Sequence, residues 1–205
     1  AIAVETTVPV GTTPAHVALS ADGTRAYTAN QSGNSMSIVD IASSATIATV
    51  PLSNGGFNVI ADPGSSRVYV TTASGMLHVV DATTRAVVAQ VQVGAASNGL
   101  ALDRGRGLLY VSSISAGTVT VVNTTTNAIV TTFAVSGNPQ RIALSADGMT
   151  LFIATEAVGL EILDVTSGDH AGVAGVAPGA VGLALSPDGQ KVYVTNPPAG
   201  LLQIV

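Results

Sequence analysis

The chain has no cysteine among its 205 residues. This excludes disulfide bonds, thiol nucleophiles and thiolate metal ligands. Charge is also scarce, because charged residues make up 9% of the sequence, against roughly 25% in an average domain. The seven basic residues stand singly, and the formal net charge is −5. Since binding to a nucleic-acid backbone needs clustered Lys and Arg, we expect no nucleic-acid partner.

Long hydrophobic runs are missing too. Apolar residues make up 47% of the chain, yet no apolar run approaches the roughly 18 residues that a membrane span requires. We therefore expect no direct membrane span. The start at Ala1-Ile2-Ala3-Val4 lacks a charged segment before an apolar core, so we expect any signal peptide to have been removed. A composition rich in Ser and Thr and poor in charge favours a periplasmic, secreted or cell-surface protein.

The sequence does contain a regular ladder of aromatic residues. Aromatic residues are only 3% of the chain, but five of them recur at steps of 42, 41, 42 and 41 residues. These are Tyr27, Tyr69, Tyr110, Phe152 and Tyr193. A unit of this length cannot bury its own apolar face and must stack on its neighbours. The ladder therefore predicts five copies of one small structural unit.

Each repeat predicts four short strands. In the first repeat an apolar strand at 17–19 is followed by the turn Asp22-Gly23, a strand carrying Tyr27, a third strand at 37–40 and a fourth at 46–50. Val, Ile, Thr and Tyr are typical of strands, and Asp-Gly between two strands indicates a hairpin. Four antiparallel strands in about 40–45 residues are typical of a β-propeller blade. The expected fold is all-β, a five-bladed β-propeller.

The two ends of the chain predict how the ring closes. The fifth repeat ends with its third strand, at residues 201–205, whereas residues 2–9 have the pattern of a fourth strand and precede the first repeat. Pairing these segments would leave no open sheet edge. We therefore expect one domain, 1–205, with its last blade shared between residues 1–9 and about 176–205.

The repeats carry a recognisable motif. Tyr193-Val194-Thr195-Asn196 is the tetrad YVTN, preceded by Leu-Ser-Pro-Asp-Gly at 185–189. Close variants begin at Tyr27, Tyr69 and Tyr110, and a looser one begins at Phe152. The chain thus resembles the YVTN-type β-propellers, which usually have seven blades. The resemblance implies a relation to surface-layer and periplasmic proteins, and to propellers akin to quinoprotein dehydrogenases and sugar lactonases. The cofactor and ligand residues of those enzymes have no counterparts that can be matched here, so we expect no cofactor.

Features repeated in every unit are interpreted as scaffold. The Asp residues of the hairpin turns and of the later Ser/Thr turns should cap turn backbone. They are Asp22, Asp147 and Asp188, and then Asp40, Asp81, Asp164 and the matching Asn123. A polar position on each third strand suggests access to water. It is filled by Ser37, His78, Thr120, Glu161 and Gln203.

The repeats differ where the first strands begin, at the expected entrance to a central channel. The differing residues that we predict to bind a ligand are His16, Phe57, Asn58, Asn98, Gln140, Arg141 and Glu156. Dissimilar polar groups around one axis suit an oriented small ligand, although polar side chains could simply solvate the mouth. Arg141 and Glu156 could form a local ion pair, or Arg141 could bind an anion. His16, His78 and His170 come from different repeats, so no metal site is expected.

Three functions remain open from the sequence. The first is a non-enzymatic, extracytoplasmic binding or protein-interaction module, whose low-charge entrance face takes a protein partner or a small neutral or anionic ligand. The second is a lyase, isomerase or hydrolase, with His16 as general base and Arg141 stabilising negative charge. The third is a structural subunit of a larger surface or membrane-associated complex.

Overall fold

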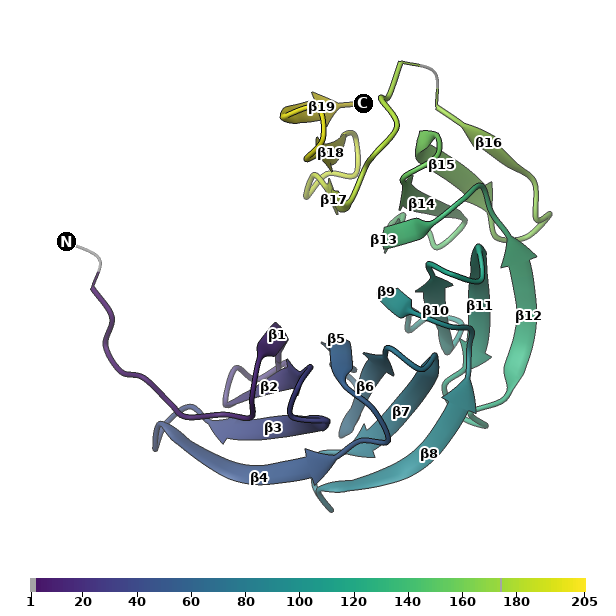
Figure 1. Ribbon diagram of the computed structural model, residues 1–205. Coiled ribbons are helices and arrows are strands. Elements are labelled where there is room, and N and C mark those ends of the chain that lie inside the picture. The colour runs from purple at the N-terminus through teal and green to yellow at the C-terminus, as the bar shows by residue number, and fades with distance from the viewer. Residues whose placement is uncertain (1–2, 174) are drawn as a thin grey trace. The chain divides into compact units, whose positions relative to one another are not determined.

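The computed structural model describes residues 3–173 and 175–205, which form strands and turns without a helix. These residues build four four-stranded sheets and one three-stranded sheet, all antiparallel (Figure 1). The chain divides into two compact units, residues 1–92 and 93–205. The all-β prediction is confirmed, and no helix long and apolar enough to cross a membrane occurs in the described ranges.

Unit 1 contains two sheets, and each is a meander in which every strand pairs with its neighbours in the sequence. The first sheet consists of β1 (Pro14–Leu19), β2 (Arg25–Asn30), β3 (Ser35–Asp40) and β4 (Ala45–Pro51). The second consists of β5 (Gly56–Ala61), β6 (Arg67–Thr72), β7 (Met76–Asp81) and β8 (Ala86–Gln92). β1 and β5, the first strands of the two sheets, pack side by side.

Unit 2 contains the other three sheets. One is built from β9 (Ser97–Asp103), β10 (Leu108–Ser113), β11 (Thr118–Asn123) and β12 (Ile129–Ala134). The next is built from β13 (Pro139–Leu144), β14 (Thr150–Thr155), β15 (Gly159–Asp164) and β16 (His170–Gly172). The last has β17 (Gly182–Leu185), β18 (Val192–Asn196) and β19 (Leu201–Ile204). β13 packs against both β9 and β17, so the first strands are again neighbours.

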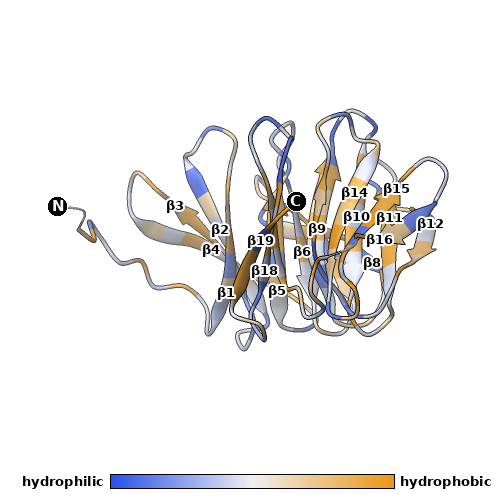
Figure 2. Ribbon diagram, turned by 90° about the horizontal axis from the view of Figure 1, so that it is seen from above, coloured by the Kyte–Doolittle hydropathy of each residue, from blue (hydrophilic) through white to orange (hydrophobic). Residues whose placement is uncertain are grey.

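The aromatic ladder marks the second strand of every sheet, as predicted. Tyr27 lies opposite Ala18 of β1 and Ile38 of β3, and the other four ladder residues lie on β6, β10, β14 and β18. β6 and β7 of the second sheet, and β10 and β11 of the third, are buried along most of their length. Figure 2 shows the hydrophobic residues concentrated on the strands, with more polar turns at their ends.

The repeated aspartates cap turn backbone, which confirms their structural interpretation. Oδ1 of Asp22 accepts hydrogen bonds from the Ser20 hydroxyl at 2.6 Å and from the Thr24 backbone N–H at 3.0 Å. These bonds, with a third from the Thr24 hydroxyl, lower the pKa of Asp22 to about 2. The same geometry recurs at Asp147 and Asp188, whose pKa values are also lowered by hydrogen bonds within their turns.

The fifth sheet has three strands in the described structure. Residues 3–13 form no strand before β1 begins at Pro14, and residue 2 of the predicted closing strand lies outside the described residues. The predicted pairing of this segment with β19 is therefore not observed. On β19, Leu202 and Ile204 are 61% and 58% exposed.

Candidate functional site

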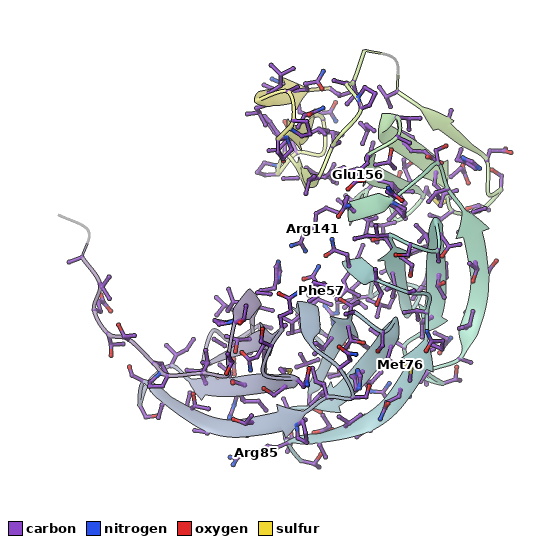
Figure 3. The ribbon with its side chains drawn as sticks, in the orientation of Figure 1. Phe57, Met76, Arg85, Arg141 and Glu156 are labelled. Atoms are coloured by element: carbon purple, nitrogen blue, oxygen red, sulfur yellow. The ribbon has the colours of Figure 1, made fainter. Side chains whose placement is uncertain are left out.

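In unit 1, the predicted site residues lie where the first strands begin. His16 follows an irregularity in the pairing of β1 with β2, and Asn58 follows the same irregularity between β5 and β6. Asn58 is 4% exposed, and its side-chain oxygen accepts the N–H of Val59 at 2.8 Å. Phe57 is half-buried at the start of β5 (Figure 3). Asn58 is therefore engaged in part with its own backbone.

In unit 2, three predicted residues join in one hydrogen-bonded row. Asn98 of β9 donates its amide to Oε1 of Gln140 on β13 at 3.1 Å. Gln140 in turn donates to Oε1 of Glu156, just after β14, at 2.8 Å. Asn138 donates to the second oxygen of Glu156 at 2.9 Å. We call these four residues the amide row.

The amide row has a defined polarity. An ionised carboxylate only accepts hydrogen bonds, so both amides that face Glu156 must present their NH₂ groups. The Gln140 oxygen is then directed to Asn98, which fixes the orientation of that amide as well. Gln140 is 8% exposed, whereas Glu156 is exposed. The row therefore runs from a buried amide to a carboxylate at the surface.

Gly99 permits the close approach of β9 and β13 that the row needs. A Cβ at this position would meet the Gln140 carbonyl oxygen and the Ser112 hydroxyl oxygen, each at 2.6 Å. Ser112 binds both strands, accepting from the Gly99 N–H at 2.8 Å and donating to the Gln140 carbonyl at 2.6 Å. Ser112 was not identified from the sequence. The available signal was Gly99, because a glycine at the position of His16, Asn58 and Arg141 indicates that another part of the backbone approaches closely.

Arg141 does not pair with Glu156 in the part of the chain that the structure describes. The Glu156 oxygens accept from the amides of Asn138 and Gln140 instead, so the local ion pair, one of the two alternatives for Arg141, does not form. Arg141 follows Gln140 on β13, is half-buried, and projects past β13 clear of the ribbon (Figure 3). Burial lowers the pKa of Arg141 from its ordinary value, but a guanidinium stays charged in proteins.

The polar position of each third strand is buried, so its expected access to water is wrong for four of the five residues. Ser37, His78 and Glu161 are 0% exposed and Thr120 is 3% exposed, while Gln203 is half-buried. We call the five residues the linker column, because each binds backbone of the segment that leads into the first strand of its own repeat. The bonds join Gly11 N to Ser37, Ser53 N to His78, Thr120 to Val93 O, Ser136 N to Glu161 and Ala177 N to Gln203.

The last residue of the tetrad supports the same segments. Asn196 donates to the carbonyls of Ala177 and Pro178 at 2.9 and 2.7 Å, and Ser113 donates to that of Val93 at 2.8 Å. Buried backbone groups need such partners. The linker column and the ends of the second strands together fix where each first strand begins, and hence where the predicted site residues lie.

Glu161 and His170 form a contact that the sequence did not indicate. Oε1 of the buried Glu161 carboxyl lies 2.6 Å from Nδ1 of His170, whose side chain is 39% exposed. Oε2 accepts the Ser136 N–H at 2.8 Å. His170 begins the short strand β16. Its place opposite Leu163 on β15 brings its ring to the carboxylate.

Comparisons with known proteins support the fold. No family model matches the chain. It is 30% identical over 146 residues to the "Uncharacterized protein YncE" of Salmonella typhimurium, and equally to that of Salmonella typhi. The match covers 68% of this chain and 41% of those proteins, so the chain spans about two fifths of their length.

A solved structure gives the fold independently. The hydrazine synthase of Kuenenia stuttgartiensis superimposes with a TM-score of 0.81 at 23% identity, over 95% of this chain and 58% of that chain. At this identity the likeness concerns the fold alone. With the five antiparallel meanders, it supports a fold of the β-propeller class.

Proposed function

We propose that this chain is a β-propeller of the YVTN type that serves as a non-enzymatic binding module outside the cytoplasm. The sheets that carry the tetrad and its variants, and the low charge of the chain, support this assignment. The site lies at the starts of the first strands, around the amide row and Arg141. The ligand is a small neutral or anionic molecule, or a polar segment of a partner protein.

The amide row carries the proposal. Its members come from β9, β13 and the loops before β13 and after β14, and direct bonds of 2.8–3.1 Å hold them in one orientation. Side chains that merely solvate a loop do not need such an arrangement, whereas a binding site needs polar groups fixed before the ligand arrives. Arg141 lies beside the row, and its guanidinium does not donate to Glu156. A planar guanidinium recognises a carboxylate or phosphate group with two parallel hydrogen bonds.

We also propose that the fold is one domain of five blades and that residues 3–9 supply the fourth strand of the last sheet. Two observations support this pairing. β19 leaves its backbone edge and the side chains of Leu202 and Ile204 exposed, and Val4 in the N-terminal segment is 84% exposed. Exposed strand edges promote self-association, so natural proteins pair or cover them.

Native mass spectrometry of the protein recovered from its source tests the binding function. We expect the wild type to carry a bound mass that Arg141→Ala loses. Arg104→Ala is the matched control, because it removes the same charge from an exposed turn of the same unit. A bound mass retained by Arg141→Ala, or lost equally from both variants, would contradict this site.

A further inference from the structure

Unit 1 contains a pocket of about 400 Å³ between its two sheets. Turn residues form it: the β1–β2 turn around Asp22, the β5–β6 turn around Asp62, and the β7–β8 turn that ends at Arg85. It therefore lies at the opposite end of the first strands from His16 and Asn58. The volume falls within the roughly 300–1,000 Å³ that is usual for small-molecule sites.

Three of the seven basic residues of the chain line this one pocket. They are Arg25, Arg67 and Arg85, and the only acids among the lining residues are Asp22 and Asp62. The lining thus carries one net positive charge in a chain whose net charge is −5. We call this the arginine pocket.

The carboxylates near these arginines are engaged in their own turns. Asp22 accepts from Ser20 and Thr24. Asp40 and Asp81, which lie opposite Arg25 and Arg67 in the strand pairing, accept from Ser43 and from Ser66, Thr83 and Thr84 respectively. These oxygens cap backbone N–H groups and hydroxyls, while each carboxylate keeps its negative charge beside the arginines.

Arg25 has donor capacity that no protein group uses. Its Nη1 atom is buried and has no hydrogen-bond partner among the described residues. Arg25 and Arg67 occupy the same position of their repeats, two residues before the ladder aromatic. The other repeats place Leu108, Thr150 and Lys191 there, so adjacent arginines at this position are specific to unit 1.

Arg85 adopts a backbone conformation that does not suit it. Its φ is +60°, in the left-handed region that non-glycine residues rarely adopt. The matching turns place Ser44, Asn127 and Gly168 there, of which asparagine and glycine tolerate this region better. One donor of Arg85, Nη1, reaches the Ile47 carbonyl of β4 at 3.1 Å, and Figure 3 shows the side chain beside that strand. Arg85 thus occupies a position where asparagine or glycine would relieve the backbone.

We infer that the arginine pocket is a second binding site, for a small molecule that carries a phosphate or carboxylate group. Arginines from two sheets line one cavity of ligand size, and a guanidinium matches the planar, two-bond geometry of such oxyanions. Hydroxyls of the lining, including Ser66 and Thr83, can accept or donate further bonds. This site is separate from the amide row and does not depend on it.

Isothermal titration calorimetry at constant ionic strength tests the inference, with inorganic phosphate in one arm and succinate in the other. We expect saturable binding of at least one anion, weakened about tenfold or more by Arg67→Thr and by Arg85→Asn, because hydrogen bonds to charged groups are the stronger kind. Lys191→Thr is the control: it removes the same charge at the equivalent position of the fifth sheet and should change the affinity less than about twofold.

The outcomes separate the alternatives. Binding of phosphate alone identifies the ligand group as a phosphate, and binding of succinate alone identifies it as a carboxylate. Binding of both shows that the pocket recognises either oxyanion. Thermal unfolding of Arg85→Asn should match or exceed that of the wild type, since asparagine tolerates a positive φ; if this variant does not fold, Arg67→Thr carries the test. The absence of saturable binding for both anions, or an equal loss in Lys191→Thr, would overturn the proposal.

Discussion

The backbone N–H of Ser53 donates to Nε2 of His78 at 3.2 Å, while the His78 ring is completely buried. An imidazole nitrogen that accepts a hydrogen bond carries no proton, so the proton of the neutral ring lies on Nδ1. Burial lowers the pKa of His78. This histidine therefore acts in the linker column as a neutral acceptor, the role that the Ser37 hydroxyl and the Gln203 amide oxygen have in their own repeats.

His78 makes stability depend on pH near neutrality. The folded pKa lies below the unfolded value of about 6.5, so its contribution to the free energy of unfolding is complete above pH 6.5 and is lost as the pH falls below it. His78→Gln keeps an acceptor and removes the titration. We expect urea unfolding between pH 7.5 and 5.5 to show a smaller decline for His78→Gln than for the wild type. Equal declines would contradict the neutral assignment.

Removal of the acceptor altogether should destabilise the fold at every pH. We expect His78→Ala to lower the free energy of unfolding by roughly 1–3 kcal/mol, because the Ser53 N–H loses its partner and the core loses the ring. Urea unfolding at pH 7.5 measures this loss, with His78→Gln as the matched control. If His78→Ala and His78→Gln have the same free energy of unfolding, the hydrogen bond from Ser53 does not stabilise the segment that leads into β5.

Gly99→Ala should separate β9 from β13. The added Cβ meets two oxygens at 2.6 Å, so we expect a loss of roughly 1–3 kcal/mol in stability, as for other overpacked sites. The bond from Asn98 to Gln140 should weaken with it, which the side-chain amide signals of both residues would report by NMR. Gly105→Ala is the control, because the nearest atom to its Cβ lies at 3.4 Å. Comparable losses in both variants would contradict the close contact.

The Asp22 carboxyl should titrate at about pH 2. The largest cause is the hydrogen bond from the Ser20 hydroxyl, so Ser20→Ala should raise the pKa of Asp22 toward its ordinary range. NMR titration of the carboxyl carbon measures both values. Since the folded pKa is the lower one, the stabilisation from Asp22 is present above about pH 4 and is lost as the pH falls toward 2. An unchanged pKa in Ser20→Ala would assign the shift to another cause.

Deletion of residues 1–9 tests the proposed closing strand. We expect a lower melting temperature and concentration-dependent self-association, because β19 would keep an open edge. Calorimetry and analytical ultracentrifugation measure the two effects. Glu5→Pro is a matched variant that keeps the length and removes one backbone donor from the segment, and it should show the same changes to a smaller degree. A deletion without effect on either property would exclude this pairing.

The repeat predicted the fold because it encodes local structure. The ladder aromatics, the hairpin turns and the Asp caps depend on residues close in sequence, so their spacing was sufficient. The linker column was misjudged because polarity alone predicts exposure, whereas His78 and Glu161 are covered by backbone from the preceding linker. The row from Asn98 to Gln140 joins neighbouring sheets, and no pattern within one repeat reports such a contact.

A crystal structure of the protein recovered from its source tests the binding site most directly. We expect electron density for a non-protein group within hydrogen-bond distance of the Arg141 guanidinium or the Gln140 amide, with the row from Asn98 to Glu156 intact. A source-derived group bound elsewhere, with only water at Arg141 and Gln140, would contradict it.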